Sequence, residues 1–258
     1  MKSYRSVCIS DIYQILKNKT YTVGPYTHFV IYEPKKREIV SQGVYDKIVN
    51  HLVARYIIYP AVLPCLLDIN VASRKNMGTA KGLELANKFH NICNKKYGTY
   101  YILKADISKF FSSIDHKKLK EKLLRRIKDK YALKIVFDII DSNDSGLYIG
   151  SMTSQILSIF YLNDLDHYIK NELKIKYYIR YQDDFLLFHN DKNYLKYCLE
   201  KIKEFLANEK LTLNNKTRIY KSTNNFVFLG RSRKGKYARY RSVSQKLKKD
   251  ILIIKIQR

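Results

Sequence analysis

The sequence predicts an α+β fold formed by one continuous body, and three observations support this. Short apolar and aromatic segments with strand character alternate with amphipathic segments with helical character along the chain. Neither a repeat nor an obvious linker separates them, and the chain holds only 4 Pro and 9 Gly. Hydrophobic residues make up 46% of the 258 residues, as in folded proteins with a buried core.

The expected strands are short. Residues 26–32 (YTHFVIY) are aromatic and β-branched, and residues 99–106 (TYYILKAD) are apolar and end on an acid. The segments YYIRY and FLLFH enclose the residues QDD, which predicts a β-hairpin with two acids at its tip. Two further strands are expected at 217–220 and 226–229.

Helices are predicted where apolar residues recur at steps of three or four. Such segments lie at 44–58, 117–130, 152–170 and 193–208, and the tail 243–258 has the start of another. The longest apolar run, Tyr56 to Leu67, contains Pro60 and Pro64 and falls short of the roughly 20 residues that a membrane span needs. We therefore expect a buried helix end and turn there, and no membrane segment.

Net charge is the strongest feature of the composition. Forty-nine Lys and Arg against 23 Asp and Glu leave a formal charge of +26. Such a surplus favours a polyanionic partner, because each phosphate that is neutralised releases counterions. The alternative is that part of the excess of lysine residues reflects the codon bias of an AT-rich genome. Together with the many aromatic residues, the charge predicts nucleic-acid binding.

The cysteines predict a reducing environment. Cys8, Cys65, Cys93 and Cys198 are widely scattered and form no CxxC pair, and the histidines beside them are not spaced as zinc ligands. The segment from Met1 to Ser10 lacks the apolar core of a signal peptide. We therefore expect isolated thiols in a cytoplasmic protein.

Three carboxylates lie at the ends of predicted strands. Asp183 and Asp184 occupy the hairpin tip, and Asp106 ends another apolar strand. A solvated turn is the alternative for the adjacent pair, because neighbouring acids repel each other. The flanking strands are too apolar for a surface excursion, which favours convergence of the three acids. Converging carboxylates are what two divalent cations need in order to activate a hydroxyl and stabilise a leaving oxygen.

These segments resemble a known family. DISKFFSSIDH (106–116) and YQDDF (181–185) are similar to motifs A and C of reverse transcriptases, and they lie about 75 residues apart with a helix between them. The resemblance extends from about residue 26 to residue 243. It implies a right-hand polymerase with fingers and palm, an antiparallel palm sheet packed on helices, and a thumb that is short or absent.

The same resemblance divides the chain into regions. Residues 1–98 would form the fingers with part of the palm, residues 99–232 the palm with motifs A to E, and residues 233–258 a connection and a rudimentary thumb. Because only about 16 residues follow the primer-grip region, the resemblance implies that an accessory protein or a structured noncoding RNA replaces the thumb.

The resemblance also assigns the residues of the chemistry. Asp106 and Asp183 would bind two Mg²⁺ ions, for which Mn²⁺ is a substitute. Asp184 would be the third carboxylate, and Ile107 would lend its backbone carbonyl to a metal. Lys216, in the segment LNNKTRIY, would lie near the pyrophosphate leaving group as a proton donor.

The residues expected at the incoming nucleotide come from several motifs. In EPKKREIVSQGVYDKIV, Lys35 and Arg37 would contact the triphosphate, and a solvated basic turn is the alternative there. Arg74, in NVASRKNMGT, could touch nucleotide or template. Phe111 matches the bulky residue that leaves no room for a ribose 2′-hydroxyl, whereas its neighbour Phe110 is expected in the core.

The segment GLYIGSMTSQ (146–155) departs from the common pattern. Most reverse transcriptases carry a Pro-Gln-Gly box there, with the Gln against the nascent base pair. Here Tyr148 replaces the Pro and Ile149 the Gln, while Gly150 keeps the turn. With Gln155, the pattern I-G-x-x-x-S-Q resembles reverse transcriptases of diversity-generating retroelements, which copy RNA with frequent errors at adenines.

Two further segments have expected positioning roles. NFVFLGRS resembles the primer grip, in which Phe228, Leu229 and Gly230 would form a turn against the primer end and the glycine allows close backbone approach. Asp115 is expected to cap the helix that follows motif A, and His116 to be structural.

The leading interpretation is an RNA-directed DNA polymerase that adds dNTPs to a primer 3′-hydroxyl, in a diversity-generating retroelement with error-prone copying. The second is an antiviral-defence reverse transcriptase that acts with a noncoding RNA and a partner protein. A non-catalytic RNA-binding subunit on a polymerase fold is a further alternative, which the three acids disfavour. A protein-primed or template-independent nucleotidyltransferase would use the same acids, and the 23 tyrosines offer hydroxyls for priming.

Overall fold

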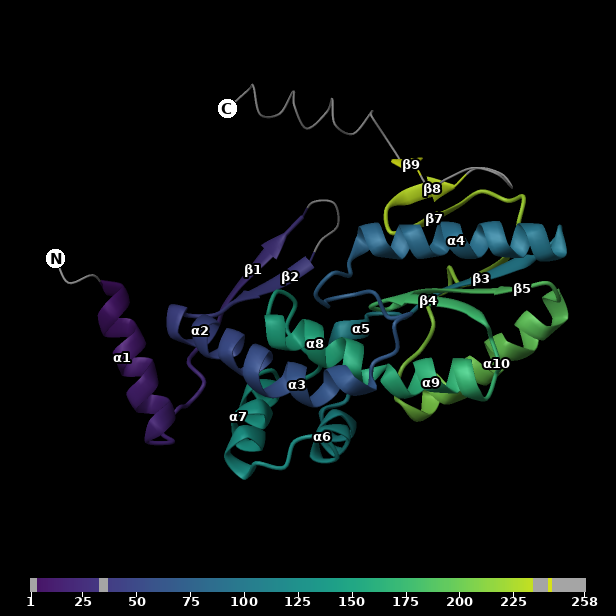
Figure 1. Cartoon of the computed structure of the whole chain (residues 1–258). Helices are drawn as coiled ribbons and strands as arrows, with labels where there is room; N and C mark the ends of the chain where they lie inside the picture. The colour runs from purple at the N-terminus through teal and green to yellow at the C-terminus, as the bar shows by residue number, and fades with distance from the viewer. Residues whose placement is uncertain (1–3, 33–36, 234–240, 243–258) are drawn as a thin grey trace, which may run out of the picture. The chain divides into compact units, whose positions relative to one another are not determined.

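The computed structural model describes residues 4–32, 37–233 and 241–242, which belong to two compact units (Figure 1). Unit 1 is formed by Met1–Leu67, Ser108–Asp166 and Leu206–Thr212, and unit 2 by Asp68–Ile107, His167–Phe205 and Leu213–Arg258. Each unit is assembled from separate stretches of chain. No Pro- or Gly-rich linker marks the division, because the chain passes between the units several times.

Unit 1 is mainly helical, and its described residues include one antiparallel two-stranded sheet, β1-β2. The strands are β1 (Thr27–Ile31) and β2 (Arg37–Ser41), and the helices are α1 (Tyr4–Lys17), α2 (Val44–Val53), η1 (Ala54–Ile58), α3 (Tyr59–Val62), η2 (Leu63–Cys65), α5 (Phe110–Ser113), α6 (His116–Leu124), α7 (Lys130–Asp141) and α8 (Met152–Tyr161). The strand expected at 26–32 and the helix expected at 44–58 are both formed.

The core of unit 1 lies where α2 and η1 pack against α8. Val49, Val53 and Ile58 are buried on one side of this helical stretch. The step of five residues between Val53 and Ile58 matches the π-helical turn η1. Pro60, two residues after Ile58, has no amide hydrogen, so the regular hydrogen-bond ladder cannot continue through it.

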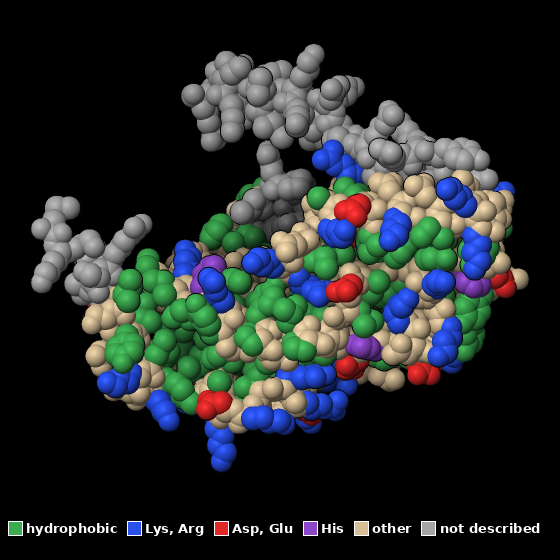
Figure 2. Space-filling view, in the orientation of Figure 1, with side chains coloured by type: hydrophobic (Ala, Val, Ile, Leu, Met, Phe, Trp, Pro, Cys, Tyr) green, Lys and Arg blue, Asp and Glu red, His purple; other side chains and the backbone are tan. Residues whose placement is uncertain are grey.

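The helical stretch Val44–Cys65 is the one in the described part of the chain that is long and apolar enough to cross a membrane by length and composition alone. Core helices of folded proteins pass the same test, and contacts with α7 and α8 bury one face of this stretch. The other face leaves Val44, Tyr45 and Tyr56 exposed. Figure 2 shows hydrophobic side chains gathered over this part of unit 1.

Unit 2 is built on a four-stranded antiparallel sheet with the order β4-β5-β3-β6, and β7-β8-β9 form a second antiparallel sheet. The strands are β3 (Tyr101–Asp106), β4 (Tyr177–Tyr181), β5 (Asp184–His189), β6 (Arg218–Lys221), β7 (Phe226–Phe228), β8 (Arg231–Arg233) and β9 (Arg241–Ser242). The helices are α4 (Thr79–Tyr97), α9 (Asn163–Asn171) and α10 (Lys192–Asn208), and the last two cross the border between the units. All the strands expected from 99 to 229 are formed.

Helices cover both faces of the four-stranded sheet, α4 on one side and α9 with α10 on the other (Figure 1). On the α4 side, the ring of Phe89 lies 5.6 Å from that of Tyr177 and 6.0 Å from that of Phe188. On the other side, Tyr168 of α9 stacks on Phe205 of α10 at 5.0 Å. Because successive strand residues point to opposite faces, one sheet supports both cores.

The single helix expected over 152–170 is wrong. Helix α8 ends at Tyr161, and α9 begins at Asn163. Between them, Leu162 has φ −89° and ψ 7°, outside the helical region, while its side chain stays buried. The apolar spacing continues on both sides of the break, so the pattern alone could not show it.

The helix expected over 117–130 is shorter than predicted. It forms as α6, which ends at Leu124, and α7 begins at Lys130. As expected, Asp115 caps α6, because its carboxylate accepts a hydrogen bond from the amide three residues later. Asp129 caps α7 in the same way. Two caps close together in sequence therefore start two separate helices.

The described cysteines, Cys65, Cys93 and Cys198, form no disulfide, as their scattered positions predicted. Burial raises the pKa of Cys93 to about 12 and that of Cys198 to about 11, which keeps both thiols protonated and unreactive. The side chain of Cys8 and the helix expected at 243–258 lie outside the described residues.

Candidate active site

The hairpin between β4 and β5 carries the adjacent acids on and beside a two-residue loop. Tyr181 pairs with Asp184, so Gln182 and Asp183 form the loop. Gln182 has φ +55°, in the left-handed region that residues other than glycine seldom adopt. Such a backbone conformation persists only where the surrounding contacts hold it.

Two side chains hold this loop. The Gln182 amide donates to Ser73 Oγ at 2.8 Å, and the Arg180 guanidinium donates to the Gln182 carbonyl at 2.8 Å. Arg180 is fully buried, and its backbone forms a bridge with Asn70 beside β4. The segment around Asn70 and the buried arginine therefore support the loop that carries Asp183.

The three predicted acids come together at one end of the sheet in unit 2. Asp106 and Asp184 are direct partners across β3 and β5, which places both side chains on the same face. Lys104 lies two residues earlier on β3, and its ammonium donates to Asp184 Oδ1 at 2.9 Å. The Lys104 and Asp184 side chains are only 21% and 22% exposed. One ammonium against these acids leaves the cluster with a negative charge when they are ionised.

In the protein alone, the negative charges of these three acids are only partly balanced by positive charge. Burial, followed by the negative charge of Asp106, raises the pKa of Asp183 to about 7. A side-chain hydrogen bond with Asp106 adds to this rise. Burial also raises the pKa of Asp184 to about 6, although Lys104 acts in the opposite direction. Partly buried like charges that favour protonation are a frequent mark of a functional site.

The donor set fits divalent cations. Carboxylate oxygens are the hard ligands that Mg²⁺ prefers, and a cation would favour the ionised forms that burial disfavours. The three acids are neighbours at this end of the sheet, but their side chains do not form a ready ligand set: within the described ranges, no group of three or more His, Cys, Asp or Glu side chains is gathered closely enough to hold a metal ion. Asp184 is engaged by Lys104, so a cation would compete with the ammonium for this carboxylate.

The turn before β6 is tied to β3. The Asn214 N–H donates to the Asp106 carbonyl at 2.7 Å, and Ile107 forms a bridge with Leu213. Lys216 lies on this turn, where its N–H donates to Asn214 Oδ1 at 3.0 Å and its side chain is exposed. The backbone that carries Lys216 is therefore anchored to the strand of Asp106. The proton-donor role of Lys216 and the metal-ligand role of Ile107 stay predictions.

The turn expected from the primer-grip segment is formed between β7 and β8. Phe228 pairs with Arg231, so Leu229 and Gly230 are the loop residues, with φ +49° and +69°. Positive φ at both positions is the geometry of a type I′ turn. A hydrogen bond from the Leu229 backbone reaches the Asp184 carboxylate and opposes the rise in its pKa. The turn thus touches the acid cluster, and its contact with a primer stays a prediction.

In unit 1, motif A continues into α5. Phe110 is buried there, as expected, and Phe111 is half-buried. The Leu147 N–H donates to the Phe111 carbonyl at 2.8 Å. Gly146 has φ +65°, and a Cβ at this position would lie 2.5 Å from the Cα of Ser112. Only a glycine therefore lets this backbone approach α5 so closely. The role of Phe111 as a gate stays a prediction.

The predicted nucleotide-binding residues of the segment GLYIGSMTSQ lie just before α8 and in its first turns. Ile149 is 38% exposed, and Gly150 has φ +113°, which glycine adopts without strain. Gln155 is exposed on α8. All three are accessible within unit 1, and their contact with a nucleotide stays a prediction.

A buried polar network fixes the backbone that follows Gly150. Asn50 of α2 is almost fully buried, and its Oδ1 accepts from Ser151 Oγ at 3.1 Å and from Thr153 Oγ1 at 2.6 Å. Its Nδ2 donates to the Asp46 carbonyl at 2.9 Å. The Ser151 hydroxyl contacts Asn50 and the Thr153 hydroxyl, and it caps no backbone amide at the start of α8.

Asn50→Ala is expected to destabilise the protein by about 2–3 kcal/mol, because the buried Ser151 and Thr153 hydroxyls lose their shared acceptor and keep only their bond to each other. Thermal unfolding followed by circular dichroism should show a fall in Tm of roughly 5–10 °C. Asn91→Ala, at an exposed position of α4, is the matched control and should change Tm little. Equal Tm values for the two variants would contradict the role of Asn50.

The basic residues expected at the nucleotide differ in their surroundings. Lys35 and the side chain of Arg37 lie outside the described residues, although Arg37 opens β2. Arg74, in unit 2, donates to the Asn70 carbonyl at 3.0 Å and pairs with Asp68 at 3.3 Å. Only 10% of the Arg74 side chain is exposed. A nucleotide or template contact by Arg74 would therefore compete with these bonds.

Sequence reasoning missed Ser73, Lys104, Arg180 and Asn50. Each of these side chains makes a hydrogen bond to a residue that local sequence patterns do not show to be its neighbour. A signal existed only for Lys104, which lies two residues before Asp106 in a predicted strand and so had to share its face. A lysine on the same face as the acids could have been included among the candidates.

A family model described as reverse transcriptase (RNA-dependent DNA polymerase) matches residues 33–232. The chain belongs to the reverse transcriptase family. The matched region of this reverse transcriptase contains the acid cluster, the turn at Gly150 and the turn between β7 and β8. No curated protein sequence matches the chain.

Solved telomerase structures share the fold. Telomerase from Candida tropicalis, truncated from its C-terminal domain, has a TM-score of 0.62 at 16% identity, over 90% of this chain and 59% of that one. The Candida tropicalis and Candida albicans enzymes in complex with a telomeric RNA fragment have TM-scores of 0.64 and 0.63, at 15% and 13% identity. The two matches cover 92% and 93% of this chain, and 48% and 49% of the respective telomerase chains.

These similarities confirm the predicted polymerase fold, with an antiparallel sheet packed on helices. At such low identity they show the fold alone. This reverse transcriptase chain spans about half the length of the telomerase chains that it matches.

Proposed function

We propose that this protein copies RNA into DNA by adding dNTPs to the 3′-hydroxyl of a primer. The observation that carries the proposal is the register of β3 and β5, which sets Asp106 opposite Asp184 and next to the loop of Asp183. The net charge of +26 supports a polyanionic template and product. The telomerases of the same fold include complexes with telomeric RNA, which supports an RNA partner.

In this proposal, Asp106, Asp183 and Asp184 hold two Mg²⁺ ions, with Mn²⁺ as a substitute and the Ile107 carbonyl as a further ligand. When bound, such ions activate the attacking hydroxyl and stabilise the leaving oxygen. The buried Arg180 fixes the loop that presents Asp183.

The remaining residues position the reactants. Lys216 donates a proton to the pyrophosphate that leaves, from a turn anchored to the strand of Asp106. Phe111 excludes ribonucleotides, and Leu229 with Gly230 turns the backbone toward the primer end. Arg37 and Lys35 neutralise the triphosphate of the incoming dNTP.

Extension of a DNA primer on an RNA template, with labelled dNTPs and Mg²⁺, tests the activity. The wild type is expected to extend the primer, and the double variant Asp183→Ala with Asp184→Ala is not. Glu200→Gln removes an exposed acid from α10 and should extend normally. No extension by the wild type with its native RNA present would overturn the proposed activity. Extension by the double variant would overturn the site, and extension without template would indicate template-independent transfer.

We further propose that copying is error-prone, as in diversity-generating retroelements. Ile149 has no hydrogen-bonding group where the common pattern has a glutamine, and Gly150 after it keeps the turn. The nascent base pair would then lack one polar contact that restrains its geometry.

Ile149→Gln is expected to lower misincorporation opposite template adenine by about fivefold, the factor that one added hydrogen bond of ~1 kcal/mol supplies. Sequencing of the extension products measures the error frequency at each template base. Ile149→Val keeps the side chain apolar and should retain the wild-type error spectrum. If the glutamine variant also retained that spectrum, the polymerase would not owe its errors to Ile149.

An accessory protein or a structured noncoding RNA completes the machinery in this proposal. Exposed apolar side chains of unit 1, among them Ile9, Tyr13 and Tyr56, support a protein partner. Purification of the complex from its native operon, with sequencing of the bound nucleic acid, identifies the partner. A template that is copied into a variable gene indicates a retroelement, whereas a noncoding RNA needed for phage resistance indicates the defence role.

A further inference from the structure

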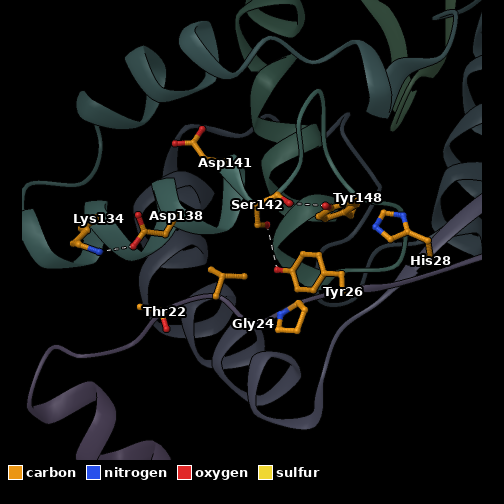
Figure 3. Close-up of a pocket in the computed structure, with 11 residues that line it drawn as sticks. Thr22, Gly24, Tyr26, His28, Lys134, Asp138, Asp141, Ser142 and Tyr148 are labelled. Atoms are coloured by element: carbon orange, nitrogen blue, oxygen red, sulfur yellow. Dashed lines mark hydrogen bonds and ion pairs between the residues drawn. The ribbon is translucent and has the colours of Figure 1, made fainter.

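Unit 1 contains a cavity that none of the predicted site residues lines. Its volume is about 630 Å³, within the roughly 300–1,000 Å³ of typical small-molecule sites. The segment 22–28, helix α7 from Lys134 onward with Ser142 after it, and Tyr148 form its walls (Figure 3). Figure 3 shows the rings of Tyr26, Tyr148 and His28 on one side, and Lys134 with Asp138 on the opposite side.

The aromatic side of the cavity is held in place by its own contacts. The rings of Tyr26 and Tyr148 lie 4.9 Å apart, edge to face, and His28 lies 6.1 Å from Tyr148. The Tyr26 hydroxyl accepts from Ser142 Oγ at 3.2 Å and from Gln42 Nε2 at 3.3 Å. The Tyr148 hydroxyl donates to the Ser142 carbonyl. A flat ligand would therefore meet rings that are already positioned, and binding would cost little side-chain entropy.

The polar side of the cavity offers an acceptor. Asp138 Oδ2 accepts from Lys134 Nζ at 2.6 Å, whereas Asp138 Oδ1 receives no hydrogen bond from the described residues. The Asp138 side chain is 35% exposed, and the ion pair with Lys134 joins neighbouring turns of α7 at the surface. Such a pair exchanges readily with solvent or ligand. Asp141 also lines the cavity, but Lys120 and His116 already occupy its carboxylate.

These two sides define the ligand by its chemistry. Aromatic walls select a flat ring, and a carboxylate selects N–H donors while repelling phosphate. In a basic chain of the reverse transcriptase family, the flat ring with N–H donors is a nucleobase that is not paired. Guanine differs from the other three bases in presenting two adjacent donors, N1–H and N2–H, on its pairing edge.

We propose that this cavity binds an unpaired guanine, which stacks on one of the nearly perpendicular rings of Tyr26 and Tyr148, meets the edge of the other, and donates its N1–H and N2–H to the Asp138 carboxylate. The guanine belongs either to a single-stranded segment of bound RNA or to a free guanine nucleotide. The proposal does not depend on polymerisation, because binding can be measured without dNTPs or metal ions.

Fluorescence anisotropy with labelled oligouridine probes that carry one central guanine, inosine or adenine tests the proposal. The wild type is expected to bind the guanine probe about five- to tenfold more tightly than the adenine probe, the discrimination typical of one bidentate contact. The inosine probe, which lacks the N2 donor, should fall between them. Competition by unlabelled GMP distinguishes the sources: displacement at a similar concentration indicates a free nucleotide, and its failure indicates RNA.

Asp138→Asn is expected to abolish the preference for guanine while leaving binding of plain oligouridine unchanged or tighter, because a negative charge is lost. Glu121→Gln removes the same charge from an exposed position of α6 and should keep the preference. Asp138→Ala, with folding of both variants checked by circular dichroism, repeats the test with a smaller side chain. Equal affinity of the wild type for the guanine and adenine probes would overturn the proposal. Persistence of the preference in both Asp138 variants would also overturn it.

Discussion

Replacing Asp183 by asparagine is expected to abolish nucleotide incorporation while making the metal-free protein more resistant to heat. The loss of incorporation, about 10³-fold or more, follows from removal of a carboxylate from the proposed metal site. The gain in stability follows from the cluster itself, because burial and the charge of Asp106 raise the pKa of Asp183 to about 7. Asparagine has nearly the same shape and carries no charge to desolvate.

The direction of the expected change in stability follows from how the stability of the folded protein depends on pH. The pKa of Asp183 is about 7 in the folded protein and near 3.8 without these surroundings. The folded state therefore holds the proton more tightly, and its stabilisation is complete below pH 4 and lost as the pH rises toward 7. Without metal, wild-type stability should fall across this range by on the order of 1–3 kcal/mol, and Asp183→Asn should show a smaller fall, because Asp184 keeps a pKa that burial raises.

Thermal unfolding in EDTA and in Mg²⁺, at pH 5 and pH 8, measures both effects. At pH 8 in EDTA the variant should have a higher Tm than the wild type, by about 2–4 °C for each kcal/mol gained in the free energy of unfolding. Mg²⁺ should raise the Tm of the wild type more than that of the variant. Glu200→Gln removes an exposed acid and should behave as wild type. A variant that melts below the wild type in EDTA at pH 8 would contradict the repulsion within the cluster.

Gly146→Ala is expected to destabilise the protein by about 3 kcal/mol or more and to abolish activity with it. The backbone of Gly146 has φ +65°, and a Cβ there would lie 2.5 Å from Ser112 Cα and 2.6 Å from its carbonyl carbon. These are backbone atoms of α5, so no side-chain rotation can relieve the clash. The Leu147 bond to the Phe111 carbonyl would be lost as the two segments separate.

The control variant Gly98→Ala distinguishes the steric clash expected at residue 146 from the backbone strain that a positive φ causes by itself. Gly98 has φ +66°, almost the same as Gly146, and nothing lies within 4 Å of a Cβ built there. Gly98 has ψ −66°, so the alanine at 98 should cost about 1–3 kcal/mol, the conformational penalty alone, and less than the alanine at 146. Urea denaturation compares the two variants with the wild type. Similar free energies of unfolding would mean that the approach of residue 146 to α5 does not matter for stability.

Local pattern was sufficient for the elements that carry the acids. Strands β3, β4 and β5 are apolar runs bounded by turn residues, and each forms within one or two residues of its predicted limits. Helix α4 was not predicted. Its buried face includes Gly82, Ala86 and His90 beside Phe89 and Cys93, and these small and polar residues obscure the apolar period. The break at Leu162 was missed for the opposite reason, because apolar residues continue through it.

The sequence by itself determined the reverse transcriptase family, the strands that end on acids, and the residues expected at the chemistry. Those features depend on neighbours along the chain or on motif residues at fixed spacing. Only the tertiary structure decided that β3 pairs with β5 in the register that sets Asp106 opposite Asp184. It also decided that Lys104 engages Asp184, that Arg180 supports the loop of Asp183, and that a cavity faces Asp138. Register and burial between distant segments depend on which faces the core can bury, and no local pattern encodes that choice.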